Sequence, residues 1–122
     1  MRERRKYFRL KSGLHVKHAT LDRDDAKSRS LIEDISRDGA RLSMREFIPR
    51  GSFLELAIRL PGIDEPLIAF AEVLWSRKKN DLKHEAGLRF TKIKGEDRAR
   101  LLDHAYHELI SGDRERFLNA AK

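Results

Sequence analysis

The sequence predicts an all-β domain in which about six short strands form a β-barrel, followed by a C-terminal helix. Three observations predict this fold class. Apolar and polar residues alternate with a period of two in several short runs, which is typical of half-buried strands. Turns that contain Gly, Pro or Asn separate these runs. Beyond Gly95 the apolar residues recur instead at helical spacing.

The expected strands follow one another with clear breaks between them. The run over residues 67–76 is apolar on both faces, as in a central strand of a closed sheet. The expected strands cover residues 14–17, 30–35, 40–45, 54–60, 67–76 and 86–90. Polar or Gly- and Pro-containing connections are expected at residues 22–29, 36–39, 49–51, 61–66 and 78–81.

A helix is expected from about residue 96 to residue 110, with one apolar stripe. The stripe consists of Leu101, Leu102, Ala105, Tyr106, Leu109 and Ile110. Ser111 and Gly112 are expected to end this helix. Asp113 would cap a short second segment that carries Phe117 and Leu118.

The length and composition fit a single domain with its own core. We expect a basic arm over residues 1–13, a barrel over residues 14–93, and a helical segment over residues 94–122 that packs against one opening of the barrel. The absence of cysteine excludes disulfides, thiolate metal sites and a cysteine nucleophile. No signal peptide is expected, and the apolar run over residues 67–74 is too short to cross a bilayer. We therefore expect a cytoplasmic protein that does not insert into membranes.

The charge balance favours an anionic partner. The chain has 27 Lys and Arg against 20 Asp and Glu, a net charge of +7. Such a balance is typical of proteins that bind nucleic acid, a nucleotide, phospholipid or an acidic protein. The charge is concentrated in the arm, whose basic residues are Arg2, Arg4, Arg5, Lys6, Arg9 and Lys11.

Two short motifs narrow the choice of ligand. Arg5 and Arg9 form an Arg-x-x-x-Arg pair, a spacing that is uninformative alone because Arg37, Arg41 and Arg45 repeat it. An Asp-x-Ser-x-x-Gly sequence closes one expected strand and opens the next, and its three defined positions are Asp34, Ser36 and Gly39. The two motifs in this order are more informative than either one.

In these motifs the chain resembles the PilZ family of cyclic di-GMP receptors. A tryptophan-bearing strand with Trp75 and a Gly-x-x-Phe strand with Gly87 and Phe90 fit the family pattern further along. The resemblance implies a six-stranded antiparallel barrel with a C-terminal helix and cyclic di-GMP as ligand. It assigns the ligand contacts to Arg5, Arg9, Asp34, Ser36 and Gly39. Arg4 matches a third arginine that, in the family, goes with capture of two intercalated cyclic di-GMP molecules.

The residue types suit this ligand chemically. A guanidinium can pair bidentately with guanine O6 and N7, stack on the base and bind phosphate oxygens. Asp34 and Ser36 are expected to face solvent together, with Ile35 pointing inward, so that the carboxylate can accept the guanine N1–H and N2–H. Gly39 is expected to permit a positive φ and close approach of the backbone. Asp38 adds a negative charge nearby, which Arg37 would offset.

Other candidate sites are weaker. His104 and His107 are spaced as a possible metal pair on the helix, but no third ligand accompanies them. His15 and His18 are expected on opposite faces of a strand. Asp24, Asp25 and Asp103 show no pairing that indicates acid–base catalysis, and Trp75 and Phe90 are expected in the core. We therefore expect no metal, no cofactor and no enzymatic activity.

The sequence thus predicts a cyclic di-GMP receptor that relays the level of this second messenger to an unidentified partner protein. The alternative is a basic β-barrel that binds nucleic acid through its arm and the face carrying Arg37, Arg41 and Arg45. Nucleic acid is the less favoured partner because few aromatic residues are expected on outer faces, whereas single-strand binders normally stack several bases.

Overall fold

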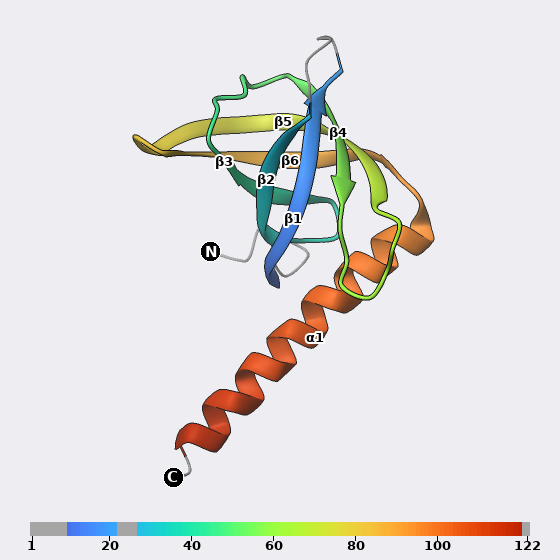
Figure 1. The fold of residues 1–122 in the computed structure, drawn as a ribbon, viewed down its shortest axis with the longest axis vertical. Coiled ribbons are helices and arrows are strands. Elements are labelled where there is room, and N and C mark those ends of the chain that lie inside the picture. Colours follow the sequence, from blue (N-terminus) through green and yellow to red (C-terminus); the bar gives the residue numbers. More distant parts are fainter. Residues whose placement is uncertain (1–9, 22–26, 121–122) are drawn as a thin grey trace, which may run out of the picture.

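The computed structural model describes residues 10–21 and 27–120. This part of the chain forms six strands and one helix: β1 (Leu10–Thr20), β2 (Ser28–Ile35), β3 (Gly39–Met44), β4 (Phe53–Ile58), β5 (Leu67–Asn80), β6 (Lys83–Ile93) and α1 (Gly95–Ala120). All of the strand pairs are antiparallel, and they close into a barrel in the order β1-β2-β3-β6-β5-β4 (Figure 1). The expected barrel with a C-terminal helix is confirmed.

The apolar and polar residues that alternate along the strands lie on the inner and outer faces of the barrel wall, respectively. On β1, for example, Leu14 and Val16 point inward while His15 and Lys17 are exposed. His18 is buried at 3% exposure, so the expectation that it faces away from His15 is confirmed. The largest fully buried apolar side chains come from four strands and the helix: Ile32, Ile35, Leu42, Leu54, Leu56, Ile58, Val73 and Leu101. A single core fills the barrel.

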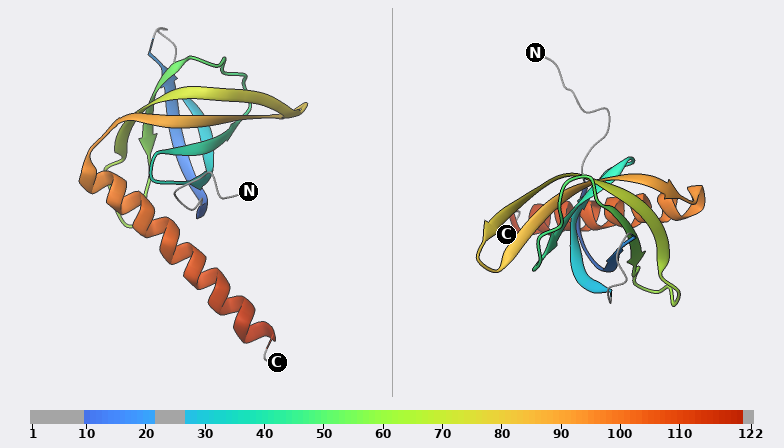
Figure 2. Two further views of the ribbon diagram at one scale, coloured as in Figure 1. Left: turned by 180° about the vertical axis from the view of Figure 1, so that it is seen from behind. Right: turned by 90° about the horizontal axis from the view of Figure 1, so that it is seen from above.

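The helix α1 covers one end of the barrel and then runs away from it. Leu101 and Ala105 belong to the core, and α1 contacts β1 and β2. Its C-terminal half extends past the barrel (Figures 1 and 2). The helix is continuous to Ala120, so the prediction that it ends at Ser111 and Gly112 is wrong. A glycine inside a helix costs only about 1 kcal/mol, which a 26-residue helix can absorb.

Two further points concern the expected helical segment. The side chains of Phe117 and Leu118 lie outside what the structure describes. Within the described residues, no helix is both long and apolar enough to span a membrane.

Candidate ligand-binding site

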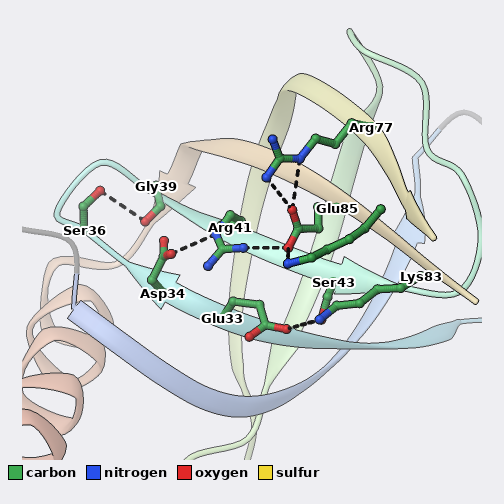
Figure 3. Close-up of polar contacts among 10 residues, drawn as sticks. Glu33, Asp34, Ser36, Gly39, Arg41, Ser43, Arg77, Lys83 and Glu85 are labelled. Atoms are coloured by element: carbon green, nitrogen blue, oxygen red, sulfur yellow. Dashed lines mark hydrogen bonds and ion pairs between the residues drawn. The ribbon is translucent and has the colours of Figure 1, made fainter.

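The connection between β2 and β3 is a tight turn at one end of the barrel. The Ser36 amide donates to the Gly39 carbonyl at 2.9 Å, and the Ser36 hydroxyl lies 3.4 Å from the same oxygen. The Phe90 amide of β6 donates to the Asp38 carbonyl at 2.8 Å, which fastens the turn to the neighbouring strand. Ser36 and Gly39 therefore close a turn that β6 holds in place, and Asp34 lies close by at the end of β2 (Figure 3).

Gly39 is needed for space and not for an unusual backbone angle. A Cβ built at Gly39 would overlap the carbonyl oxygen of Leu88 and press on its carbonyl carbon. The close backbone approach expected at this glycine is confirmed. The positive φ expected there is wrong, because among the residues described only Gly51 and Gly62 have one. The turn closes with β-region or helical angles that any residue could adopt, while β6 leaves no room for a side chain.

Asp34 is more buried than its expected place on a solvent-facing edge. It is 6% exposed, and its Oδ2 accepts a hydrogen bond from Arg41 Nε at 2.9 Å. A β-bulge in β2 explains the placement: Ile32 lies opposite Leu42 and Asp34 opposite Arg41, so Glu33 is an extra residue. The bulge brings both carboxylates to the outer wall of the barrel (Figure 3). The expectation that Asp34 faces solvent is wrong, because its side chain is buried and hydrogen-bonded to Arg41.

Arg41 connects Asp34 to a second and fully buried carboxylate, Glu85 of β6. Arg41 Nη1 donates to Glu85 Oε2 at 2.6 Å. Arg77 donates to Glu85 Oε1 at 3.1 Å from Nε and 2.8 Å from Nη2, and Lys79 Nζ lies 3.5 Å from Oε2. Burial by itself raises the pKa of Glu85, but these hydrogen bonds and charges outweigh it and hold the pKa below its usual value.

The bulged residue Glu33 has its own partners. The Ser43 hydroxyl donates to Glu33 Oε2 at 2.7 Å, and Lys83 Nζ lies 3.2 Å from the same oxygen. The Ser43 hydrogen bond is the largest influence and lowers the pKa of Glu33, against a smaller opposing effect of burial. The outer wall beside the turn therefore carries charged side chains that are joined to one another by hydrogen bonds and ion pairs.

A cross-strand row places an aromatic ring beside this network. Asp34 lies opposite Arg41, Arg41 opposite Gly87, and Gly87 opposite Trp75. Because Gly87 has no side chain, the indole of Trp75 lies over it, and a Cβ at Gly87 would overlap Trp75 Nε1. Trp75 is 36% exposed, and the Arg77 guanidinium lies 5.4 Å from its ring centroid.

Trp75 is the residue that sequence reasoning misplaced. It was expected in the core, whereas Phe90, which is 7% exposed, does lie there. The signal that could have found it is the glycine itself, because an isolated glycine inside a strand often marks a site where something approaches the backbone closely. Which group approaches Gly87 depends on the β5–β6 register, and that register has irregularities on both sides of Trp75.

The charge of Asp38 is met from the helix. Asp38 Oδ1 lies 3.9 Å from Arg98 Nη1 of α1. The sequence predicts only that the neighbouring Arg37 offsets the charge of Asp38, and it does not predict this contact with the helix. The ion pair is long and its partners are 31% and 62% exposed, so its energetic contribution is small. It nevertheless joins the motif turn to the first turns of α1.

The arginines of the arm, Arg4, Arg5 and Arg9, lie outside the described residues. The structure does describe where the arm joins the barrel. Leu10 pairs with Ile35 and Lys11 with Asp34, so the chain enters β1 directly beside the second motif. The structure brings Asp34, Ser36 and Gly39 together at that entry point.

The weaker candidates gain no support as metal or catalytic sites. In the described part of the chain, no group of three or more His, Cys, Asp or Glu could hold a metal ion. His107 Nδ1 lies 2.8 Å from the Asp103 carbonyl oxygen, a contact within one turn of α1. Asp24 and Asp25 lie outside the described residues.

Comparison with family models decides the family, because the PilZ domain model matches residues 3–107. The chain belongs to the PilZ domain family. The matched part includes both motifs, the whole barrel and the first half of α1. No curated protein matches the chain.

Solved PilZ-type structures have the same fold. MotI/DgrA, an inhibitor of motility from Bacillus subtilis, superposes with a TM-score of 0.72 at 23% identity, over 90% of this chain and 53% of that one. The PilZ domain of YcgR from Escherichia coli, solved with c-di-GMP, gives 0.65 at 15% identity, over 98% and 99%. MrkH of K. pneumonia in its apo state gives 0.70 at 14% identity, over 94% and 55%. At these identities the likeness shows the fold, and this PilZ chain spans about half the length of MotI and MrkH.

Proposed function

We propose that this PilZ protein is a cytoplasmic bacterial receptor that binds cyclic di-GMP without cleaving it and relays its occupancy to a partner protein. The observation that carries the proposal is the position of the second motif: Ser36 and Gly39 close the turn that follows Asp34 at the end of β2, and β1 begins beside it, with Leu10 opposite Ile35. The PilZ domain of YcgR, which shares the fold, has been solved with c-di-GMP.

The proposed contacts divide the ligand between the arm and the barrel. Arg5 and Arg9 would bind the phosphates and guanine O6 and N7, because a guanidinium fork suits both. Asp34 would accept the guanine N1–H and N2–H, and the Ser36 hydroxyl can donate or accept. The absence of a side chain at Gly39 keeps the turn against β6, which holds the Asp34 end of β2 in place.

Arg41 is a positioning residue in this proposal. Its Nε holds Asp34 Oδ2 at 2.9 Å, and its Nη1 is itself held by Glu85 at 2.6 Å. Two fixed ends leave the guanidinium little freedom, so the Asp34 carboxylate is oriented before a ligand arrives. Preorganised acceptors of this kind reduce the ordering cost of binding.

Trp75 extends the proposed site. It stands in the same cross-strand row as Asp34, with part of its ring exposed. Cyclic di-GMP carries two guanines, so that while one meets Asp34 with its edge, the other would find an aromatic surface and the Arg77 guanidinium further along the wall. Base–aromatic stacking contributes about 1–3 kcal/mol per base, which is comparable with a charged hydrogen bond.

We further propose two ligands per chain. Arg4 supplies a third guanidinium just before the Arg5–Arg9 pair. Two intercalated cyclic di-GMP molecules bring four phosphates together, and several cations are needed to offset their repulsion. Arg4→Leu is expected to shift the stoichiometry from two ligands to one while binding remains measurable. A wild-type ratio of one that Arg4→Leu leaves unchanged would contradict this assignment.

The relay to a partner would use α1. The ion pair between Asp38 and Arg98 connects the motif turn to this helix, and the C-terminal half of α1 extends beyond the barrel. A ligand phosphate near the turn would compete with Asp38 for Arg98. The contact between turn and helix is therefore expected to change with occupancy.

Nucleic-acid binding remains the second candidate, and one observation weakens it. Arg41, the central residue of the expected basic face, is engaged with Asp34 and Glu85 and has only 22% of its side chain exposed. Salt dependence separates the two functions. Affinity for a polynucleotide falls steeply with ionic strength because many counterions are released, whereas a compact ligand with two phosphates gives a shallow slope.

Titration calorimetry with cyclic di-GMP tests the proposal. We expect saturable binding, selectivity over GMP and GTP, and no hydrolysis. Arg9→Ala and Asp34→Asn should each weaken binding by about tenfold or more, because each removes a charged hydrogen-bond partner. Arg50→Ala and Asp64→Asn, at exposed positions on other turns, are the matched controls. Absence of heat and of a thermal shift at saturating ligand would refute the proposal.

A further inference from the structure

A second basic region lies on the outer wall of the barrel, away from the motif turn. Here β1 is flanked by β2 and β4 (Figure 1), and the three strands enclose a hollow of about 410 Å³. Its lining includes the basic residues His15, Lys17, Arg29 and Arg59, together with the small apolar residues Ala57 and Pro66. A volume of this size falls in the range of small-molecule sites, about 300–1,000 Å³.

The basic residues converge because of the strand register. Lys17 lies directly opposite Arg29 on β2 and opposite Ala57 on β4. The Arg59 amide donates to the His15 carbonyl at 3.1 Å, so these two residues occupy the next row. Like charges directly opposite each other in an antiparallel pair destabilise a sheet. The fold therefore retains an unfavourable Lys17–Arg29 pair beside a hollow.

In the described part of the protein, no carboxylate neutralises the positive charge of these basic residues. Among residues 10–21 and 27–120, none of His15, Lys17, Arg29 and Arg59 forms an ion pair with a carboxylate. The Arg59 guanidinium donates to the backbone oxygen of Asp64, which leaves its charge uncompensated. On β4, Glu55 pairs with Ala19 one row away and is not part of the lining.

The hollow is separate from the proposed cyclic di-GMP site. Lys11 marks that site on β1, because it lies opposite Asp34. Arg29, opposite Lys17, is five residues from Asp34 along β2, which corresponds to about 17 Å at roughly 3.3 Å per residue. A ligand held by Lys17 and Arg29 would not contact the motif turn.

We propose that this hollow binds a small organic molecule with a phosphate group. A phosphate dianion offsets Lys17 and Arg29 together, whereas a single carboxylate would leave one of the opposed charges in excess. The guanidinium groups of Arg29 and Arg59 suit phosphate oxygens bidentately. Ala57 leaves space opposite Lys17, and Pro66 adds apolar surface for the organic part of the ligand. A hollow of this limited size fits such a molecule better than an extended acidic peptide.

The test is an amide NMR titration of the full chain at constant ionic strength, with inorganic phosphate and with ribose 5-phosphate as probes. We expect saturable shifts at residues 15–17, 29–30 and 57–59, with ribose 5-phosphate binding about tenfold more tightly because its sugar fills the hollow. Equal affinity for the two probes would show that the ion alone binds and would overturn the assignment to an organic phosphate.

Lys17→Glu is the decisive variant, and it is not expected to unfold the protein. It replaces a like-charge pair with an opposite-charge pair across β1 and β2, so a thermal melt should show equal or higher stability. Binding of ribose 5-phosphate should weaken by about tenfold or more. Lys92→Glu, an identical charge change at an exposed position on β6, should retain binding. The proposal would be overturned if both variants lost binding equally, or if the NMR shifts were confined to the motif turn. It would also be overturned if the hollow bound hexaglutamate, a probe for acidic peptides, and neither phosphate.

Discussion

Arg41 Nη1 lies 2.6 Å from Oε2 of Glu85, a carboxylate whose side chain has no exposed surface. Through the same guanidinium, the buried charge on β6 is connected to Asp34 at the end of β2. Asp34, the proposed ligand contact, is therefore connected through Arg41 to Glu85, which lies 51 positions later in the sequence. Such an arrangement makes the stability of the wall and the geometry of the site depend on one another.

Glu85→Gln is expected to destabilise the protein by about 2–3 kcal/mol, since it removes the buried charge that Arg77 and Arg41 Nη1 share and leaves Arg41 with Asp34 alone. The exposed part of Arg77 stays hydrated, which keeps the loss below that of a fully buried pair. Urea denaturation followed by circular dichroism measures the change. Glu72→Gln is the control: its bond to Arg89 is also 2.6 Å long, but both partners are partly exposed, so the expected loss is below about 1 kcal/mol. Equal losses in the two variants would contradict this account of Glu85.

Mild acid is expected to lower the stability through His18. This side chain is 3% exposed, with Nδ1 3.0 Å from the Ser30 hydroxyl. Burial lowers its pKa below the usual 6.5, against a smaller opposing effect of Glu46. In the unfolded chain His18 takes up a proton as the pH falls through about 6.5, while in the folded chain it does so only at lower pH. The contribution of neutral His18 to the stability is therefore complete above pH 6.5, and it is lost as the pH falls toward the pKa of His18 in the folded chain.

The measurement for His18 is the urea midpoint between pH 7.5 and pH 5. His18→Gln should flatten the fall seen in the wild type over this range. His15→Gln, on the exposed face of the same strand, should keep the wild-type profile. A wild-type midpoint that does not change over the range would show that burial of His18 has no effect on stability.

Gly39→Ala is expected to cost about 1–3 kcal/mol, because the added methyl group meets the Leu88 backbone and not a mobile side chain. Relief requires β3 and β6 to separate at the motif turn, so cyclic di-GMP affinity should fall together with stability. Gly95→Ala, where no atom lies within 4 Å of the added Cβ, should leave both unchanged or slightly raise stability. Thermal melts and calorimetry on both variants provide the comparison, and a Gly39→Ala protein of wild-type stability would be inconsistent with the crowding.

Trp75 should report ligand binding directly, because it is the single tryptophan of the chain. Cyclic di-GMP is expected to change its fluorescence, and Trp75→Leu should weaken binding about tenfold through loss of stacking. Phe53→Leu removes an aromatic ring of similar exposure, 49%, from β4 and should leave the affinity unchanged. If the ligand binds without changing the fluorescence of the wild type, and if Trp75→Leu keeps the wild-type affinity, then the base does not stack on Trp75.

The sequence by itself determined the barrel, the helix and the motif turn. The alternation of Leu54, Leu56 and Ile58 with residues such as Glu55 and Arg59 specifies one face of a strand, and such patterns depend only on residues two apart. The Asp-x-Ser-x-x-Gly motif is also local, so the gathering of its residues on one turn could be predicted. The helix was predicted well at its start and poorly at its end, because α1 tolerates a glycine at position 112 that local reasoning reads as a stop.

Only the tertiary structure decided what surrounds the motif. The contact of Asp34 with Arg41 follows from a one-residue bulge in β2, and the contact of Arg41 with Glu85 from the placement of β6 beside β3. Trp75 is exposed because the β5–β6 register sets it over Gly87, and Lys17 opposes Arg29 because of the pairing of β1 with β2. A shift of one residue in any of these registers would turn the side chains to the other face of the wall. Register is set by the packing of the whole barrel, and so the charges and the ring that complete the candidate sites cannot be located from neighbouring residues in the chain.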